Sequence, residues 1–388
     1  MTSMFIKKDF PLGSLFFVLL LASSLTNCQQ PNAGDKAIAT ASLVSNTTEI
    51  SIDTTPPPID TPKYHHIIGV GDMMLGTNYP SKSYLPANGG KDMLASVQDS
   101  LLVADVTFGN LEGTILDSGG TAKRCSNPDA CYVFRSPESY GQHFANAGFD
   151  LLSLANNHSG DFGLTGRNKT KAVLDELDIA YAGLAGTDET AIIERDGIKY
   201  GFCAFAPNSG TCDVRNLSRA KSIVASLVPK CDIIIVSFHG GAEGSKHQHV
   251  TRKTETYYGE NRGNVYNFAH AVVDAGADIV FGHGPHVTRA MELYNDRLIC
   301  YSLGNFCTYG RFNVRGVNGV APIVSLRVDD EGQFVDGKIL PIYQMKTHGP
   351  KFDPQKRAIQ LVRDLTASDI PDTDLEISAD GILSRGGS

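Results

Sequence analysis

The sequence predicts an α/β fold that starts near Tyr64, and three observations support this prediction. Six short apolar runs are each followed at once by Gly, Asn, Asp or His. Apolar runs without alternation are typical of strands buried on both faces. Segments with helical spacing of apolar residues lie between the runs, and two of them end in a glycine that leads directly into a strand. Alternation of strand and helix indicates the α/β class.

Each element can be assigned in order along the chain. Helices are expected within 93–102, 171–180 and 265–275. The segment 321–345 is typical of a β-hairpin with its turn at Asp329–Gln333, 354–365 of an amphipathic helix, and the end of the chain of a polar tail. The six apolar runs with their polar ends are 67–76, 104–113, 150–163, 232–244, 277–286 and 298–306.

The N-terminus has the pattern of an export signal. Lys7 and Lys8 precede an apolar stretch that is too short to span a membrane, and Leu25 lies three residues before Cys28. This predicts a bacterial lipoprotein with signal peptide 1–27 and lipidation at Cys28. An ordinary secretory peptide is the alternative. Both place the mature protein outside the cytoplasm, in the periplasm or at the cell surface.

The remainder divides by composition into three parts. Residues 28–63 are rich in Ser, Thr and Pro and are expected to form a linker between membrane and domain. The main domain is assigned to 64–350, and 351–388 to a C-terminal helix and polar tail. The net charge of −8, without a long basic block, argues against nucleic acid as a partner.

The cysteines suggest disulfides rather than a metal site, because no pair has the spacing of a zinc site. Cys125 and Cys131 lie in a polar loop and could close a short disulfide. Cys203 and Cys212 are a second candidate pair. The other three, Cys231, Cys300 and Cys307, flank apolar strands and are expected to be core thiols.

The polar clusters carry the functional prediction. In α/β sheets, ligand sites gather beyond the carboxyl ends of strands, so clusters scattered along the sequence can meet at one rim. Carboxylates and neutral imidazoles together bind divalent metals, and a free imidazole can move a proton during hydrolysis. The candidates are Asp72, Asn110, Glu112, Asn157, His158, Asp161, His239, His283 and His286.

Taken singly, each of these residues has an ordinary structural interpretation. Asp72 suits a turn or helix cap, Asn156 and Asn157 are common turn formers, and His239 and Glu243 suit solvated loops. The following polar run, 244–262, suggests a mobile lid or a substrate-facing loop, in which His247 and His249 are solvated rather than ligating. Only the shared placement after strands favours a composite site.

Six motifs in fixed order carry a family resemblance: "GDMMLG", "GNLEG", "LANNHSGDFG", "FHGGAEG", "GADIVFGHGPHV" and "YSLGNF". Between about residues 65 and 310 the chain resembles the CapA-type capsule synthesis proteins, which are tied to poly-γ-glutamate capsules. That family is similar in fold to calcineurin-like metallophosphoesterases, two sheets packed as a sandwich with helices on both outer faces. The resemblance implies metal ligation by Asp72, Glu112, Asn157, His239, His283 and His286, with His158 as the acid or orienting group.

Two departures leave the metal count open. Met74 stands where metallophosphoesterases carry a histidine, and Glu112 stands near the position of their bridging aspartate. With the metal count left open, the resemblance implies a metal-dependent hydrolase of phosphoester or amide bonds that uses Mn, Zn or Fe. Its partners would be the capsule synthesis machinery and the membrane, reached through the lipid anchor. The alternative is a non-catalytic module that binds an anionic envelope polymer such as poly-γ-glutamate.

Overall fold

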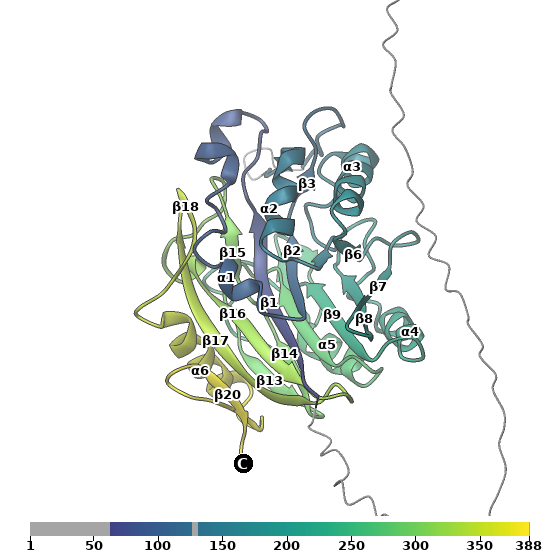
Figure 1. Cartoon of the computed structure of the whole chain (residues 1–388), viewed down its shortest axis with the longest axis vertical. Coiled ribbons are helices and arrows are strands. Elements are labelled where there is room, and N and C mark those ends of the chain that lie inside the picture. The colour runs from purple at the N-terminus through teal and green to yellow at the C-terminus, as the bar shows by residue number, and fades with distance from the viewer. Residues whose placement is uncertain (1–62, 126–130, 388) are drawn as a thin grey trace, which may run out of the picture. The chain divides into compact units, whose positions relative to one another are not determined.

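Strand β1 (His65–Met74) organises the first of two large sheets (Figure 1). The computed structural model describes residues 63–125 and 131–387, so the predicted signal peptide, Cys28 and nearly all of the linker lie outside the described residues. β1 pairs in parallel with β2 (Val106–Leu111), which leads through β5 (Leu151–Ser153) to β6 (Ala180–Ala182).

On its other side, β1 has both an antiparallel and a parallel neighbour. β16 (Val320–Val328) pairs with β1 and with β17 (Phe334–Met345), as the hairpin prediction required. β15 (Asn305–Thr308) pairs with the carboxyl end of β1. At the edge, β17 also pairs with β18 (His348–Phe352) and with β20 (Ile382–Arg385), which pairs with β19 (Leu375–Ile377). The predicted polar tail is therefore wrong for this segment, because Leu375 and Leu383 join the core and draw it into the sheet.

The second sheet has the order β13-β14-β12-β9-β8-β7. Its central strands β12 (Ile279–His283) and β9 (Ile233–His239) are parallel, and β8 (Ile198–Phe205) and β14 (Arg297–Cys300) continue the parallel arrangement on either side. β7 (Thr190–Arg195) and β13 (Met291–Tyr294) close the two edges in antiparallel fashion. Two short pairs, β3 (Thr114–Ile115) with β4 (Arg135–Ser136) and β10 (Thr256–Tyr257) with β11 (Glu260–Asn261), lie in loops.

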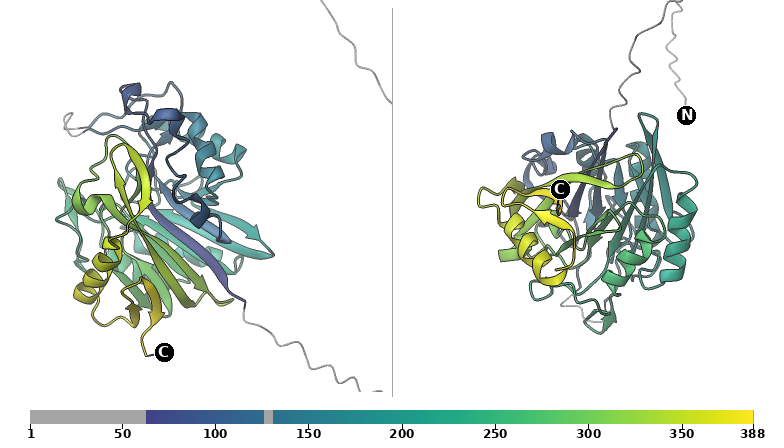
Figure 2. Two further views of the ribbon diagram at one scale, coloured as in Figure 1. Left: turned by 60° about the vertical axis from the view of Figure 1, so that its left-hand side comes forward. Right: turned by 90° about the horizontal axis from the view of Figure 1, so that it is seen from below.

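Burial on both faces of each sheet produces the layers seen in Figures 1 and 2. Ile67 of β1 and Ile235 of β9 belong to the cluster between the sheets, whereas the next residue in each strand contacts an outer layer. α2 (Gly141–Asn146) and α3 (Gly163–Glu176) cover the first sheet; α4 (Leu217–Leu227) and α5 (Val265–Val273) cover the second. The α/β prediction and the two-sheet sandwich flanked by helices are confirmed.

The helix predictions succeeded where the apolar stripe is long. α5 and α6 (Arg357–Asp369) lie within a few residues of their predicted ranges. Only Gln98–Leu101 forms the α-helix α1 within 93–102, because the preceding turns bury Met93, Leu94 and Val97 without regular helix geometry. α6 closes one edge of the sandwich: Ile359 and Val362 enter the core between the sheets.

The cysteine predictions have mixed outcomes. Cys125 and Cys131 form a disulfide, as expected. Cys203 and Cys212 are free, so the second candidate pair is wrong; both thiols are buried in the apolar layer behind the second sheet. Cys231, Cys300 and Cys307 are also free.

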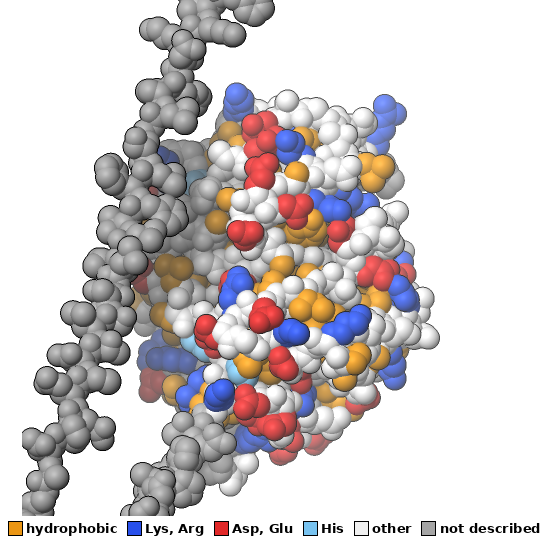
Figure 3. Space-filling model, turned by 45° about the vertical axis from the view of Figure 1, so that its right-hand side comes forward, with side chains coloured by type: hydrophobic (Ala, Val, Ile, Leu, Met, Phe, Trp, Pro, Cys, Tyr) orange, Lys and Arg blue, Asp and Glu red, His pale blue; other side chains and the backbone are white. Residues whose placement is uncertain are grey.

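Charges on the face shown in Figure 3 are interspersed, with acidic and basic side chains side by side rather than in patches of one sign. Within residues 63–125 and 131–387, none of the helices combines the length and the apolar character that crossing a membrane requires.

A buried arginine anchors the loop that follows β9, residues 241–263. The fully buried Arg289 donates to both carboxylate oxygens of Glu255 (2.8 and 2.7 Å) and to the carbonyl oxygen of His247 (2.9 Å). Glu255 in turn accepts a hydrogen bond from the backbone N–H of Ala242 (2.8 Å). These contacts fix the 241–263 loop to the body of the domain, which favours a substrate-facing loop over a mobile lid. The side chain of His249 is 64% exposed and pairs with Asp369 (2.8 Å). It is therefore not among the candidate metal ligands.

We predict that Arg289→Met lowers the free energy of unfolding by about 3–5 kcal/mol, because it leaves the Glu255 carboxylate buried without its charge partner. Replacing both partners, as in Arg289→Met/Glu255→Leu, should cost clearly less than the single change. Urea unfolding followed by circular dichroism measures both. The control is Arg327→Met: Arg327 pairs with Asp336 at the surface and is 46% exposed, so the loss should stay below about 1 kcal/mol. Equal losses in the buried and surface variants would contradict the anchoring role.

Candidate metal centre

Asp72 lies near the carboxyl end of β1, in a stretch where strand pairing is irregular. The register shifts between Gly69 and Asp72 against β2, and again between Asp72 and Met73 against β15. Such bulges bend a strand and redirect a side chain. The backbone N–H of Asp72 donates to the carbonyl of Gly304 (2.8 Å), and a Cβ on Gly71 would lie 2.0 Å from that same oxygen, so only glycine fits before Asp72.

The Asp72 carboxylate is fully buried and links the two sheets. Its Oδ1 accepts a hydrogen bond from Asn110 (2.9 Å) and lies 3.1 Å from Nδ1 of His283, while its Oδ2 lies 2.9 Å from Nδ1 of His286. Asn110 is in turn held by Asn156, whose amide also donates to the Leu111 carbonyl. Asn156 is therefore more than a turn former, because it positions the partner of Asp72.

Glu112 follows β2 directly and is also fully buried. Its backbone N–H donates to the carbonyl of Met73 (2.9 Å), which fixes it beside β1. Neither carboxylate oxygen has a hydrogen-bond partner among the described residues, and the nearest cationic atom is Nε2 of His286 at 3.4 Å. A buried carboxylate without hydrogen bonds is costly, so an absent ligand is its simplest explanation.

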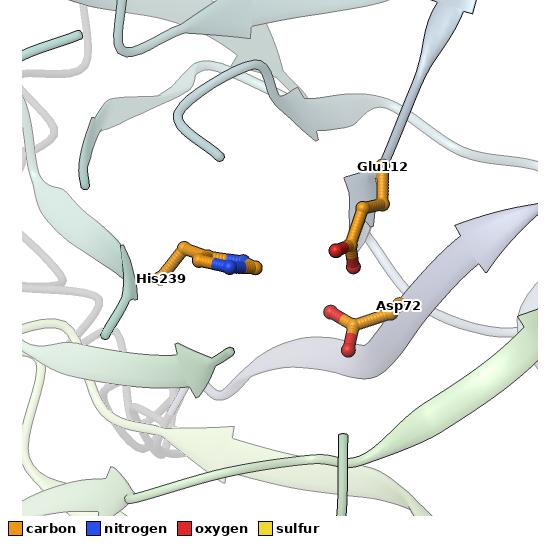
Figure 4. A group of neighbouring side chains, drawn as sticks. All are labelled: Asp72, Glu112 and His239. Atoms are coloured by element: carbon orange, nitrogen blue, oxygen red, sulfur yellow. The ribbon is translucent and has the colours of Figure 1, made fainter. Parts of the chain in front are cut away.

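The histidines come from the second sheet. His239 ends β9 and His283 ends β12, and the two are directly paired in the parallel ladder. Asp72, Glu112 and His239 each offer a ligand-type atom, and these atoms lie within 4.8 Å of one another. Figure 4 shows the imidazole of His239 directed at the two carboxylates, which face each other.

His286 completes the group from the loop after β12. Its backbone has φ of +56°, a conformation that costs a residue with a side chain about 1–3 kcal/mol and is concentrated at functional sites. Asn305 and Asn318 hold it there by donating to its carbonyl (3.1 and 3.3 Å). Its ring contacts Phe312 edge-on, with the centroids 5.4 Å apart.

Protonation within this cluster is strongly perturbed. Burial raises the pKa of Glu112. Burial alone would lower the pKa of His286, but the charges of Glu112 and Asp72 and the hydrogen bond to Asp72 raise it to about 10. Burial also opposes ionisation of Asp72, yet hydrogen bonds from His283 and His286 hold its pKa far below the usual range. Burial and the charge of Arg262 lower the pKa of His239, which favours its neutral form.

His158 lies at one side of the cluster, in the loop after β5. Its Nδ1 is 2.8 Å from Oδ2 of Asp161, and its ring packs on Phe134 with the centroids 4.2 Å apart. Nζ of Lys123 forms an ion pair with Oδ1 of Asp161 (2.5 Å) and donates to the carbonyl of Asn157 (3.0 Å). Burial lowers the pKa of His158 although Asp161 acts in the opposite direction.

The structure thus brings most of the predicted residues into contact. Asp72, Glu112, His239, His283 and His286 form one group, and Asn157 precedes His158 in the loop after β5. The Oδ1 atom of Asn157 is buried and has no partner among the described residues. Met74 packs with Phe134 and Phe312 in a small apolar cluster. Because these two phenylalanines contact the rings of His158 and His286, the cluster forms an apolar wall beside the candidate centre. Glu243, interpreted from sequence as a solvated loop residue, is largely buried and pairs with Arg262 (3.0 Å).

Sequence reasoning missed two cations beside the site, Lys123 and Arg262. Lys123 lies next to the Cys125–Cys131 disulfide, and Arg262 at the end of the 241–263 loop. Both belong to polar, irregular segments without periodicity, where nothing in the sequence gives the direction of a side chain.

The donor atoms fit a divalent ion. Several buried atoms of the types that bind Mn, Zn or Fe have no hydrogen-bond partner within the described part of the chain: both oxygens of Glu112, Nδ1 of His239, Nε2 of His283 and Oδ1 of Asn157. The mixture of carboxylate, imidazole and carboxamide suits a metal of intermediate hardness.

Two stacked sheets with helices on both outer faces, and carboxylates and histidines gathered at their strand ends, define an α/β sandwich with a candidate metal centre. The chain belongs to the family described as bacterial capsule synthesis protein PGA_cap, whose sequence profile matches residues 66–309. The family resemblance drawn from the six motifs is confirmed.

Two relatives illustrate the similarity. The chain is 28% identical over 246 residues to the capsule biosynthesis protein CapA of Bacillus anthracis, a match that covers 61% of this chain and 58% of the relative. It is 28% identical over 247 residues to the PGA biosynthesis protein CapA of Bacillus subtilis, covering 61% of each chain. The chain thus spans roughly three fifths of the length of these relatives.

Solved structures with a similar arrangement include a 5′-nucleotidase precursor from Thermus thermophilus, with 10% identity and a TM-score of 0.42, covering 80% of this chain and 59% of that one. A purple acid phosphatase from yellow lupin seeds has 11% identity and a TM-score of 0.37, covering 76% of this chain and 55% of that one.

We predict that metal binding releases protons. At neutral pH, the pKa of about 10 keeps on His286 a proton that this ring must lose to become a ligand, and the raised pKa of Glu112 acts in the same direction. The affinity for Mn²⁺ should therefore rise with pH toward about 10, by about tenfold per pH unit for each proton released. Calorimetric titration in two buffers with different ionisation enthalpies counts the protons. His286→Gln should release one proton fewer, and an affinity independent of pH between 6 and 9 would contradict the assignment.

Proposed function

We propose that this protein is a metal-dependent hydrolase of the cell envelope that acts in the biosynthesis or export of poly-γ-glutamate capsule. The single observation that carries the proposal is the buried group of Asp72, Glu112 and His239, with ligand-type atoms within 4.8 Å of one another. The unpartnered oxygens of Glu112 support it, because no hydrogen bond from residues 63–125 or 131–387 compensates their burial. The target would be a phosphoester or amide bond.

Asp72, Glu112 and His239 would hold the ion, and His283, His286 and Asn157 are further candidate ligands. A bound Mn, Zn or Fe ion would polarise the substrate and lower the pKa of water. Asn110 donates to Oδ1 of Asp72, the oxygen that His283 also contacts, and such supporting hydrogen bonds commonly affect metal affinity about 10- to 100-fold. The wall formed by Met74, Phe134 and Phe312 would exclude water from one side.

His158 would move the proton. Asp161 accepts from Nδ1, so the neutral ring carries its proton there and presents Nε2 as an acceptor. The lowered pKa of His158 favours this neutral form. Nε2 would take a proton from the attacking group and return it to the leaving group. Lys123 would act through Asp161, as a positioning residue.

The cellular setting rests on the family and on the N-terminal sequence. The relatives named above are described as capsule and PGA biosynthesis proteins, so the capsule synthesis machinery and its anionic polymer are the proposed partners. We also propose that the protein is a lipoprotein anchored through Cys28. Mass spectrometry of the mature N-terminus would show a diacylglyceryl cysteine, and an unmodified terminus would argue for ordinary secretion.

A non-catalytic module that binds an anionic polymer is the second candidate. The observation that favours it is the position of His286, whose ring nitrogens face both Asp72 (2.9 Å) and Glu112 (3.4 Å). A protonated His286 compensates part of the carboxylate charge without any metal. Metal content separates the two candidates.

Elemental mass spectrometry of the purified protein should find stoichiometric metal, and hydrolysis of generic phosphoester or γ-glutamyl amide substrates should depend on it. Glu112→Gln and His239→Ala should each weaken metal binding by at least about 100-fold, since each removes a ligand atom. His158→Asn should retain the metal and lose about 10²- to 10⁴-fold in turnover.

The matched control is His348→Ala, which removes an exposed imidazole on β18 and should change neither metal content nor turnover. A folded parent protein that takes up no Mn, Zn or Fe after incubation would exclude the hydrolase and leave the binding module.

A further inference from the structure

Arg262 is a buried cation at the candidate metal centre whose hydrogen-bonding capacity is only partly used. Its side chain is 3% exposed. The backbone is fixed on both sides: its N–H donates to the Glu255 carbonyl (2.8 Å), and its carbonyl accepts from the N–H of Gly241 (3.0 Å). The 241–263 loop therefore delivers this guanidinium to a set position.

The guanidinium faces the centre. Its Nη2 lies 3.3 Å from Nε2 of His239 and 3.0 Å from Oε1 of Glu243. Because arginine can only donate, Nε2 of His239 is the acceptor in this contact. The charge of Arg262 also opposes the effect of burial on Glu112 by lowering the pKa of that carboxyl.

Arg262 has fewer hydrogen-bond acceptors around its guanidinium than Arg289, which is also buried. Arg289, which lies between β12 and β13 and is buried against the same loop, donates from its Nε, Nη1 and Nη2 atoms to protein oxygens. In Arg262, the Nε atom is buried with no partner among the described residues, and Nη1 has only the exposed Glu260 at 4.0 Å. A buried guanidinium with unused donors lacks the acceptors that would compensate its desolvation.

Metal binding would free a further donor. If an ion took Nε2 of His239, the contact with Arg262 would be displaced. If it took Nδ1, a neutral ring would carry its proton on Nε2, which could then no longer accept. In both cases Nη2 of Arg262 loses its imidazole partner as the centre fills, while Glu243 continues to hold the guanidinium by charge.

We propose that Arg262 binds an oxyanion of the substrate, a carboxylate or phosphate group, beside the metal centre and so determines the selection of anionic substrates. Guanidinium is suited to this because its planar fork of donors matches both groups and its charge does not titrate. The inference deepens the proposed function of the same centre, but the oxyanion contact itself requires only the geometry of Arg262.

The test is calorimetric binding of inorganic phosphate and of a γ-linked glutamate trimer to the purified protein, in metal-depleted buffer and after loading with Mn²⁺. The parent should bind at least one of them, more tightly when loaded, and the two probes distinguish a phosphate site from a carboxylate site. Arg262→Met should weaken that binding by about 10- to 100-fold while metal content stays the same. Arg262→Lys, which keeps the charge and loses the fork, should give an intermediate loss.

The double variant Arg262→Met/Glu243→Gln keeps the test decisive if the single change unfolds the protein, because it leaves no unpaired buried carboxylate. The control is Arg215→Met, which removes an exposed arginine paired with Asp213 and should bind as the parent does. A parent that binds neither probe, or folded Arg262 variants that bind as tightly as the parent, would overturn the inference. Oxyanion binding that depends on Arg262 in a protein that takes up no metal would keep the inference and reject the hydrolase.

Discussion

The contact between Asp72 and the two histidines of the second sheet is the interaction on which the candidate site depends. Asp72 belongs to β1, while His283 and His286 belong to the end of β12 and the loop behind it, so one carboxylate connects both sheets at their carboxyl ends. A fully buried carboxylate is tolerated only when charge and hydrogen bonds compensate it. The Asn156–Asn110 relay contributes to that compensation, and the bulge in β1 and the glycine before Asp72 allow the backbone to place the carboxylate there.

Around this contact, the protein retains features that oppose stability. His286 has a left-handed backbone, Glu112 has two oxygens without hydrogen bonds, and Arg262 has unused donors. None of these is relieved by the described residues around them, whereas all three side-chain nitrogens of the nearby Arg289 donate to protein oxygens. One buried group thus contains an anionic side chain without hydrogen bonds and a cationic side chain with unused donors. A centre that binds a metal ion and an anionic ligand requires both.

Much of this could be predicted from the sequence because the signals were local. Apolar runs ending in polar residues predicted β1, β2, β9 and β12. Ligand sites in α/β sheets gather beyond the carboxyl ends of strands, which predicted that Asp72, Glu112, His239 and His283 would meet. Other features depended on tertiary packing. The C-terminal strands β19 and β20 form because Leu375 and Leu383 find room in the core, and Cys203 and Cys212 are both buried in the apolar layer behind the second sheet as free thiols. The position of Arg262 could not be predicted from the sequence, because it depends on the contact between Arg289 and Glu255 that anchors the 241–263 loop.

The most direct test of the central claim is the position of a bound metal. Crystals of the protein grown with Mn²⁺ and measured near the manganese absorption edge would locate the ion by anomalous scattering. We predict a peak within ligand distance of Asp72, Glu112 and His239, about 2.0–2.3 Å from their donor atoms. A fully occupied peak elsewhere would contradict this assignment. So would the absence of a peak in crystals in which these three side chains keep the positions that they have without metal.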